Sequence, residues 1–427
     1  MNLFETKTAV TNGAYDMRLA DIYGGKAQAM SQRDRYSELL DEFVLRFGGN
    51  PHGIRLFSSP GRTEIGGNHT DHNHGKVLAA SIDLDTIAAV LPKEDALITV
   101  CSKGYEAVKV ELNDLEPKEN EKGHSHSLVR GICARFKQLG ANIGGFDAAT
   151  TSRVLSGSGL SSSAAFEMLI CTILNEVYNK GRFTPVELAK ISKYTENEYF
   201  GKPCGLMDQT ACAVGGIISI DFKDTENPEI TNISFEFEST DHVLCIVDTG
   251  GSHADLTDDY SSIAGEMRAV AAAMGGEVLR DIPFSRFLDN ISELRVKTGD
   301  RAVERAMHFY RENERVDREV TALNIGDFDK FKKYFQQSGN SSFMYNQNVF
   351  TLRNPAQQPL ALALAMSENL LSESGGVWRV HGGGFAGTIQ CIMPKKELHR
   401  YITSMRSVFG EKSCYILSIR ADGACEI

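Results

Sequence analysis

The stretch Leu155-Ser156-Gly157-Ser158-Gly159-Leu160-Ser161-Ser162-Ser163-Ala164-Ala165-Phe166-Glu167 decides the fold, and it joins two apolar segments. Its two glycines leave the backbone unobstructed, three serines follow, and residues 164–177 have the apolar composition of a helix. A glycine- and serine-rich loop that runs into a helix start presents free backbone N–H groups and the positive end of the helix dipole. The stretch therefore predicts a phosphate site. A flexible linker is the alternative, but a linker would continue polar.

The bulk composition describes an ordinary globular chain with an acidic balance. It has 427 residues, enough for two or three domains, of which 42% are hydrophobic and 24% charged. The formal net charge is −11, and no run of lysine or arginine is longer than a pair. A duplex nucleic-acid binder would need a basic face, so that class is disfavoured, whereas a small anionic ligand needs only a local positive field.

Cysteine usage and the apolar runs bear on the compartment. The nine cysteines form no Cys-x-x-Cys pair, and Cys171, Cys212 and Cys245 stand among apolar residues, as buried thiols do. Such usage suits a reducing compartment. There is no apolar signal core near the N-terminus and no run as long as a membrane span. We therefore expect a monomeric cytoplasmic protein with neither a nucleic-acid nor a membrane partner.

Apolar periodicity predicts mixed secondary structure in both halves of the chain. The expected helices are 32–47, 128–139, 164–177 and one from 184, followed by 257–275, 286–297, 300–322, 326–340, 357–372 and 396–409. The expected strands are 54–57, 77–91, 96–102, 107–112, 148–154, 217–222, 233–237, 242–248, 377–381, 388–393 and 413–420, with a turn at 58–61. A polar stretch at 223–232 suggests a boundary, giving domains 1–225 and 226–427. The pattern predicts an α+β protein of two domains with a cleft between them.

The segment 60–75 is rich in polar and glycine residues where a core strand is expected, which indicates a site. It reads Pro-Gly-Arg-Thr-Glu-Ile-Gly-Gly-Asn-His-Thr-Asp-His-Asn-His-Gly. Its histidines and aspartate suggest zinc, but the remaining histidines form no second ligand cluster. A polar pocket for a hydroxyl-rich ligand explains the alternating donors and acceptors better.

Three further segments carry polar or glycine residues between apolar elements. Asp208 stands among apolar and glycine residues in 201–209. In such surroundings a carboxylate is paired with a cation or has a raised pKa, and both favour a catalytic role. A plain helix cap is the alternative. Segment 248–260 taken alone is a strand-to-helix loop. Segment 381–388 holds three consecutive glycines, which indicate a close approach of backbone or ligand, or else a tight turn. The motifs of P-loop ATPases, protein kinases and dinucleotide-binding folds are absent.

These segments, in this order, resemble the GHMP small-molecule kinases and, within them, the galactokinases. The family pattern Gly-Arg-x-Asn-x-Ile-Gly-Glu-His-Thr-Asp-Tyr-Asn corresponds to residues 61–73, Pro-x-Gly-x-Gly-Leu-Ser-Ser-Ser-Ala to 155–164, and Gly-Gly-Gly-Phe-Gly-Gly to 382–387 with Ala386 as the one change. Residues 203–209, Pro-Cys-Gly-Leu-Met-Asp-Gln, are similar to the galactokinase catalytic segment. The resemblance implies a two-domain GHMP kinase fold. Its N-terminal domain would be like domain 2 of ribosomal protein S5, its C-terminal domain would be ferredoxin-like, and the active site would lie in the cleft between them.

The resemblance also implies an ATP- and Mg²⁺-dependent kinase that phosphorylates the C1 hydroxyl of galactose or a close relative. Asp208 matches the catalytic aspartate that takes the proton of that hydroxyl, and Arg62 the arginine that steadies the aspartate and the transferred phosphoryl group. Ser162 and Glu196 match the Mg²⁺ ligands. The phosphate loop would comprise Gly157, Ser158, Gly159, Leu160, Ser161, Ser162 and Ser163, and the sugar contacts Asn68, His69, Asp71, Gly205, Tyr260 and Gly383.

Three departures from the family pattern concern the ligands. The glutamate that contacts the C6 hydroxyl in galactokinases is Asn68 here, and the following tyrosine is His72. An amide can donate hydrogen bonds to a C6 carboxylate that a glutamate would repel, so galacturonate, arabinose or an amino sugar is a candidate beside galactose. His124-Ser125-His126-Ser127 replaces an aromatic residue near the adenine, which leaves the nucleotide base open. A kinase-like sugar sensor without turnover is the alternative of another class, although the serine loop and Asp208 are intact.

Overall fold

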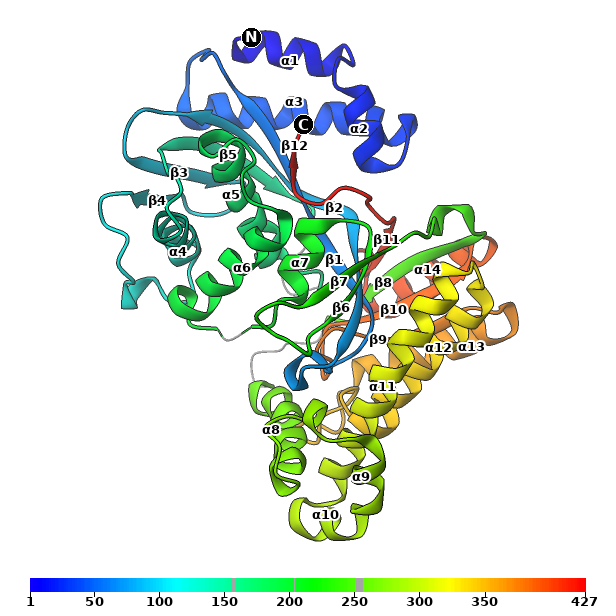
Figure 1. Ribbon diagram of the computed structural model, residues 1–427. Helices are drawn as coiled ribbons and strands as arrows, with labels where there is room; N and C mark the ends of the chain where they lie inside the picture. Colours follow the sequence, from blue (N-terminus) through cyan, green and yellow to red (C-terminus); the bar gives the residue numbers. More distant parts are fainter. Residues whose placement is uncertain (155–158, 203, 251–255) are drawn as a thin grey trace.

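Two sheets, one built mainly from each half of the chain, organise the computed structural model, which describes residues 1–154, 159–202, 204–250 and 256–427 (Figure 1). The first half forms α1 (Leu3–Thr11), α2 (Asp16–Tyr23), α3 (Lys26–Phe47), β1 (Arg55–Gly66), β2 (Lys76–Pro92), β3 (Leu97–Ser102), β4 (Val108–Glu111), α4 (Ser125–Gln138), β5 (Phe146–Ser152), α5 (Ser162–Tyr178), α6 (Pro185–Thr195), α7 (Met207–Val214) and β6 (Ile217–Asp221). The second half forms β7 (Glu229–Ile233), β8 (His242–Asp248), α8 (Thr257–Ala273), α9 (Phe284–Asp289), α10 (Ile291–Thr298), α11 (Asp300–Asn324), α12 (Phe328–Ser341), α13 (Pro359–Leu371), β9 (Val377–His381), β10 (Thr388–Pro394), α14 (Leu398–Phe409), β11 (Cys414–Leu417) and β12 (Cys425–Glu426).

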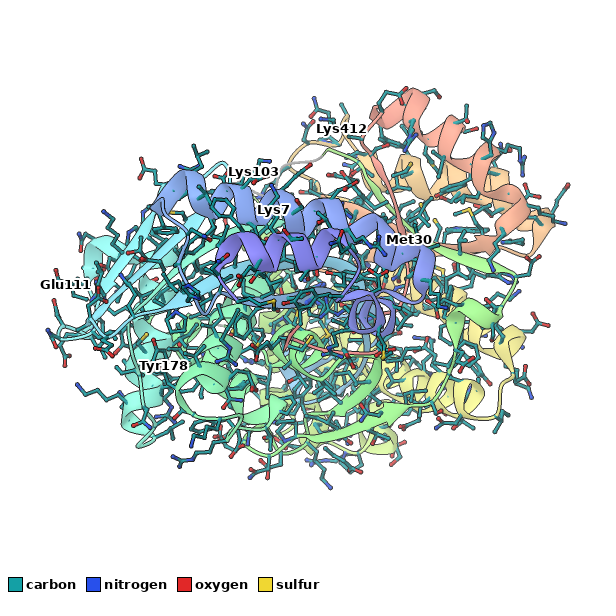
Figure 2. The ribbon with its side chains drawn as sticks, turned by 90° about the horizontal axis from the view of Figure 1, so that it is seen from above. Lys7, Met30, Lys103, Glu111, Tyr178 and Lys412 are labelled. Atoms are coloured by element: carbon teal, nitrogen blue, oxygen red, sulfur yellow. The ribbon has the colours of Figure 1, made fainter. Side chains whose placement is uncertain are left out.

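The first sheet has eight strands and is buried on both faces. Its order is β12-β1-β2-β5-β3-β4, with β6 pairing β2 and β7 pairing β6. Among the strands of the described residues, only β3 and β5 run parallel. Successive side chains of a strand point to opposite faces. Ala88 and Val90 accordingly join the core under α4–α7, whereas Ile87 and Ala89 pack with α1–α3. Seen from above, α1 and α3 run side by side across that second face, with Lys7 and Met30 marking them (Figure 2).

The second sheet has four antiparallel strands in the order β11-β8-β10-β9. Helices α13 and α14 pack on one face of it, and α12 packs on β9. Helices α8, α9, α10 and the first half of α11 share a separate apolar core, and α8–α10 extend away from both sheets (Figure 1). The second half of α11 packs against the first sheet. The α+β class expected from the sequence is confirmed. Within the described ranges, no helix combines the length and the apolar composition needed to cross a bilayer.

The largest difference from the expected elements lies in β1. The sequence predicts a strand at 54–57 and a turn at 58–61, and this turn is wrong. The strand continues to Gly66, and its register against β2 shifts between Pro60 and Arg62 and again between Glu64 and Gly66. The first irregularity accommodates Pro60, which has no N–H to donate to the neighbouring strand. Because Arg62 and Glu64 are two residues apart in one strand, both point to the same side of the sheet.

Several other boundaries differ from the predictions. Helices α1 and α2 were not expected, and α3 begins at Lys26 rather than at residue 32. The strand expected at 233–237 is wrong, because β7 ends at Ile233. The helix expected at 286–297 is interrupted at Asn290.

Two strands beyond residue 226 belong to the first sheet. β7 pairs with β6, and β12 pairs with β1 through Phe57 opposite Glu426. Residues 226–427 therefore complete the first sheet as well as forming the second, and the division of the chain at 225/226 stays a prediction.

Candidate active site

A pocket of about 440 Å³ lies where β1, the loop before β2, α7 and the glycine-rich loop between β9 and β10 meet. It is lined by Arg62, Glu64, Asn68, His69, Asp71, His72, Ser163, Glu196, Lys202, Cys204, Gly205, Met207, Asp208, Gln209, Leu256, Tyr260, Gly382, Gly383, Gly384 and Phe385. The segments that the sequence singled out at 60–75, 201–209 and 381–388 thus converge on one cavity. Residues 251–255 of the fourth segment lie outside the described ranges.

Arg62 and Asp208 form a two-pronged ion pair at this pocket. Arg62 Nε donates to Asp208 Oδ1 at 2.8 Å, and Nη2 donates to Oδ2 at 2.9 Å. The third nitrogen, Nη1, donates to the carbonyl of Gly159. Ser161 Oγ donates to Asp208 Oδ2 as well. Bidentate geometry of this kind fixes orientation in addition to charge.

The surroundings of Asp208 keep its carboxylate ionised. Burial by itself would raise the pKa of Asp208, but the Arg62 guanidinium and the hydrogen bonds from Arg62 and Ser161 outweigh it, so the pKa lies below the usual value. Asp208 also stands in the first turn of α7, where the helix dipole favours negative charge. At neutral pH this group is an anion held in a fixed orientation.

The serine loop begins α5 beside that pair. Ser161 adopts a left-handed conformation with φ 59°, and α5 starts at Ser162, two residues earlier than expected. Gly159 has φ +71°, and a Cβ there would stand 3.2 Å from both His381 Nδ1 and Thr388 Oγ1. The loop therefore lies against the ends of β9 and β10, and Leu160 is fully buried. Gly157 and Ser158, expected to bind phosphate, lie outside the described residues.

Ser162 and Glu196 offer oxygen atoms near this loop. Glu196 is only 3% exposed, lines the pocket, and accepts a hydrogen bond from Gln209 Nε2 at 3.1 Å. Burial and then the charge of Glu196 raise the pKa of the neighbouring Glu167 well above its usual value, and Oε1 of Glu167 has no partner among the described residues. Glu196 lines the pocket and Ser162 is the first residue of α5. A carboxylate and a hydroxyl are oxygen ligands of the kind that a hard cation such as Mg²⁺ prefers. In the described part of the chain, no three His, Cys, Asp or Glu side chains converge as they do in zinc centres.

A ring cluster forms another part of the pocket wall. His69 Nε2 lies 2.9 Å from the carbonyl of Gly383, and His72 Nε2 lies 3.2 Å from Tyr260 Oη. The His69 and Tyr260 ring centroids are 5.2 Å apart. The structure thus brings His69 and Tyr260 together, as the resemblance implies, and it adds the His72 ring to them.

Two glycines of the site exist because side chains approach them. A Cβ on Gly205 would stand 2.7 Å from Asp71 Oδ2, and one on Gly383 would stand 2.7 Å from Tyr260 Cε2. Any larger residue at these positions would displace the polar groups of the wall.

Asn68 has no hydrogen-bonding capacity left for a ligand. Its Nδ2 donates to Glu64 Oε1 at 2.9 Å and to the Gly382 carbonyl at 2.8 Å. Its Oδ1 accepts from Ser342 Oγ at 3.1 Å and from Asn348 Nδ2 at 2.9 Å. The side chain is fully buried. The expectation that this amide hydrogen-bonds the sugar, or donates to a C6 carboxylate, therefore lacks a free donor.

Replacing His69 with glutamine is expected to flatten the pH dependence of stability. Burial, and next the proximity of His72, lower the pKa of His69 to about 3. Between about pH 6.5 and 3 the unfolded chain binds a proton that the folded chain does not, so acidification removes stability that is fully present above pH 6.5. From pH 6.5 to 5 the wild type should lose about 2 kcal/mol relative to His69→Gln in denaturant titrations. Parallel curves for the two proteins would contradict the prediction.

Some lining residues were not predicted. Glu64 stands inside the quoted motif, at the place where the family pattern has asparagine, so a signal was present. Lys202, Cys204 and Gln209 lie beside the predicted Asp208. Arg379, which pairs with Glu64, had no signal, because its position in β9 reads as an ordinary strand residue.

Comparisons with known proteins agree with this geometry. The model of the GHMP kinases N terminal domain matches residues 127–216, and the galactokinase galactose-binding signature matches residues 41–92. A galactokinase of Streptomyces coelicolor is 30% identical over 371 residues, which cover 85% of this chain and 88% of that protein. A galactokinase of Clostridium tetani is 28% identical over 399 residues, which cover 92% and 97%.

Solved structures extend the likeness to the fold. The galactokinase of Lactococcus lactis complexed with galactose has a TM-score of 0.78 at 24% identity, over 92% of this chain and 100% of that chain. A mevalonate kinase has a TM-score of 0.61 at 16% identity, over 86% and 99%. Sequence identity at this level across most of both chains shows that the protein belongs to the galactokinase family of the GHMP kinases, whose sugar-kinase fold it shares.

Proposed function

We propose that the protein transfers the γ-phosphoryl group of ATP to the C1 hydroxyl of galactose, giving galactose 1-phosphate. The observation that carries the proposal is the Arg62–Asp208 ion pair at a polar pocket, with Ser161 of the serine loop bonded to the same carboxylate. The carboxylate of Asp208, which can orient a hydroxyl, is therefore hydrogen-bonded to the serine loop, which is expected to hold the phosphates. The curated relatives named galactokinase support galactose as the acceptor.

Asp208 would act mainly by positioning. Its lowered pKa makes it a weak base but a permanent anion, and the transition state of phosphoryl transfer requires little proton abstraction before the bond to the leaving group is loosened. A carboxylate held by Arg62 can accept the C1 hydroxyl hydrogen bond, aim its oxygen at the phosphorus and take the proton late. Arg62 would at the same time offset charge on the transferred group.

The start of α5 would receive the phosphates of ATP. The helix has 17 residues, its first backbone N–H groups have no partner within the helix, and Ser161, Ser162 and Ser163 add hydroxyls there. Ser162 and Glu196 would hold Mg²⁺. Such an ion supplies charge neutralisation for the phosphate oxygens.

A Glu196→Gln variant is expected to need more Mg²⁺. The amide keeps the shape of the side chain but removes the negative charge that attracts the cation. The Mg²⁺ concentration for half-maximal turnover should rise at least about tenfold at fixed ATP. Tenfold is the lower end of the loss in metal affinity that follows when residues around a metal are changed. An unchanged Mg²⁺ titration would remove Glu196 from this role.

The sugar would lie with C1 at Asp208 and its exocyclic C6 group at the wall formed by Glu64 and Asn68. Proposed contacts along its ring are His69, Asp71, Gly205, Tyr260 and Gly383, which all line the pocket. The pocket volume of about 440 Å³ exceeds the lower size limit of small-molecule sites.

The test is ATP-dependent phosphorylation by the purified protein across a panel of galactose, arabinose, galacturonate, galactosamine and glucose. Sugar-dependent ADP release should be highest with galactose, and NMR of the product should place the phosphate on C1. Absence of sugar-dependent ADP release across the panel, or a phosphate on another oxygen, would refute the proposal.

A further inference from the structure

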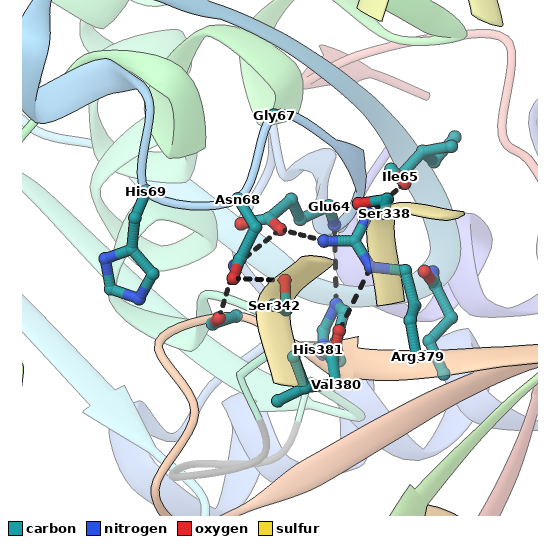
Figure 3. A network of polar contacts seen from close by, with 12 residues as sticks. Glu64, Ile65, Gly67, Asn68, His69, Ser338, Ser342, Arg379, Val380 and His381 are labelled. Carbon is teal, nitrogen blue, oxygen red and sulfur yellow. Dashed lines mark hydrogen bonds and ion pairs between the residues drawn. The ribbon is translucent and has the colours of Figure 1, made fainter. Parts of the chain in front are cut away.

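Positions 64 and 68 carry an exchanged pair of residues. The family pattern has asparagine and then glutamate at these two places, whereas this chain has Glu64 and then Asn68. The two side chains touch, with Asn68 Nδ2 donating to Glu64 Oε1 at 2.9 Å. One carboxylate and one amide therefore remain at this wall of the pocket, in contact with each other (Figure 3). Their positions are exchanged relative to the family pattern.

Arg379 determines how the carboxylate of Glu64 is oriented. Its Nη2 donates to Glu64 Oε1 at 2.7 Å, and Nη1 donates to the carbonyl of Ile65. Nε donates to the carbonyl of Val380 at 3.1 Å. The guanidinium is 1% exposed and comes from β9, so one oxygen of Glu64 is fixed by a cation and an amide at once.

The second oxygen of Glu64 is available. No hydrogen bond to Oε2 exists within the described residues, and Figure 3 shows dashed lines to one carboxylate oxygen only. This atom is also not among the unpartnered polar atoms that are shielded from solvent. Because Glu64 lines the pocket, the oxygen is open to a ligand there. Asn68, by contrast, has used both amide hydrogens and both acceptor positions of its oxygen.

We propose that Glu64, through Oε2, accepts a hydrogen bond from a hydroxyl of the acceptor sugar, and that Asn68 and Arg379 only position it. The inference rests on the proposed function, which places the C6 group at this wall. Burial raises the pKa of Glu64, and the Arg379 guanidinium opposes that rise. A carboxylate that is paired with Arg379 accepts hydrogen bonds and donates none.

Asp71 and Asp208 line the same pocket, and Arg379 is already paired. The lining cation Lys202 acts on Asp208 and Glu167 and not on Glu64, so it does not offset the charge at this wall. The site therefore selects neutral sugars with a C6 hydroxyl and disfavours uronates.

The test compares galactose with 6-deoxygalactose in the wild type and in Glu64→Gln. The wild type should use 6-deoxygalactose about 10- to 100-fold less efficiently in kcat/KM, because a hydrogen bond to a charged group is lost. Glu64→Gln keeps an oxygen for Arg379, lowers kcat/KM for galactose about tenfold, and leaves 6-deoxygalactose nearly unchanged. The ratio of the two sugars should thus fall toward one.

Two further variants separate binding from structure. Ser342→Ala removes one bond to Asn68 Oδ1 without touching Glu64, so the ratio should stay at the wild-type value even if both rates fall. The double exchange Glu64→Asn with Asn68→Glu restores the family order and should recover the discrimination lost in Glu64→Gln. Galacturonate should remain at least about 100-fold poorer than galactose in the wild type, like a ligand with a buried unpaired charge.

Three results would overturn the inference. The first is a wild type that uses both sugars equally. The second is a Glu64→Gln variant in which both sugars lose rate by the same factor, which would make Glu64 purely structural. The third is efficient use of galacturonate. Each of these requires an active wild type, so none can be confused with failure of the proposed function, in which no sugar would release ADP and the inference would fall with it.

Discussion

Replacing Asp208 with asparagine should reduce turnover about 1,000-fold, within the range of 10²–10⁴ that a positioned acid–base group contributes. The asparagine fits the same volume, and its one oxygen can accept from Arg62 Nη2 and Ser161 Oγ. Its NH2 group replaces the oxygen that accepts from Arg62 Nε, and the side chain can neither carry the negative charge nor take the proton of the hydroxyl. The expected loss lies in kcat with galactose and ATP saturating, measured as ADP release.

Sugar binding provides the control for Asp208→Asn. Calorimetric titration with galactose should show an affinity within about tenfold of the wild type, because the amide oxygen can still accept from the C1 hydroxyl and only the difference between a charged and a neutral hydrogen bond, about 1 kcal/mol, is lost. Turnover within tenfold of the wild type would contradict a catalytic role for Asp208. Loss of binding together with turnover would instead assign the residue to substrate recognition.

Replacing Asp85 with asparagine should destabilise the fold by about 3–5 kcal/mol, the cost of leaving buried charges unpaired. Asp85 is fully buried in β2 and accepts from Arg35 Nη1, from Ser58 Oγ, and from Arg420 Nη1 at 3.2 Å. Burial would raise the pKa of Asp85, but the two guanidiniums outweigh it and lower the pKa. An amide cannot balance two buried cations, so both would lose their counter-charge.

Asp41→Asn is the matched control for Asp85→Asn. Asp41 pairs with Lys7 on the surface, where its side chain is 61% exposed, and such pairs contribute about 0–1 kcal/mol. The midpoint of urea unfolding followed by circular dichroism should fall strongly for Asp85→Asn and little for Asp41→Asn. Because Asp85 lies outside the pocket, molecules that remain folded should keep wild-type kcat/KM. Equal midpoints for the two variants would contradict the assigned role of Asp85 as the counter-charge of Arg35 and Arg420.

The local parts of the fold could be predicted from the sequence. Residues 164–177 are mostly apolar and residues 184–187 carry a capping box, so the sequence predicts α5 and α6 nearly as they stand. The turn expected at 58–61 failed because Ser-Ser-Pro-Gly has the composition of a turn. This segment stays extended because it pairs with β2, and a register shift at Pro60 accommodates the proline. Tertiary pairing of this kind overrides local preference.

The candidate site divides in the same way. Arg62, Asp208 and the serine loop stand in motifs whose spacing is recognisable, and the structure brings Arg62 and Asp208 into contact across 146 positions. Arg379, Ser342 and Asn348 have no such signal, because their role depends on which strand end and which helical turn meet the loop after β1. A contact between residues that are distant in the chain leaves no local periodicity for a single sequence to reveal.

The pairing of β12 with β1 has a consequence for how the molecule is made. Arg55 and Glu426 form an ion pair between residues that are 371 positions apart, next to the strand that carries Arg62. During synthesis β1 emerges early and keeps an unpaired edge until residues 425–426 leave the ribosome. Exposed strand edges invite pairing with other chains. Residues 1–225 expressed alone would lack both β7 and β12. We expect such a fragment, like the incomplete chain during synthesis, to expose the edge of β1 until residues 425–426 are present.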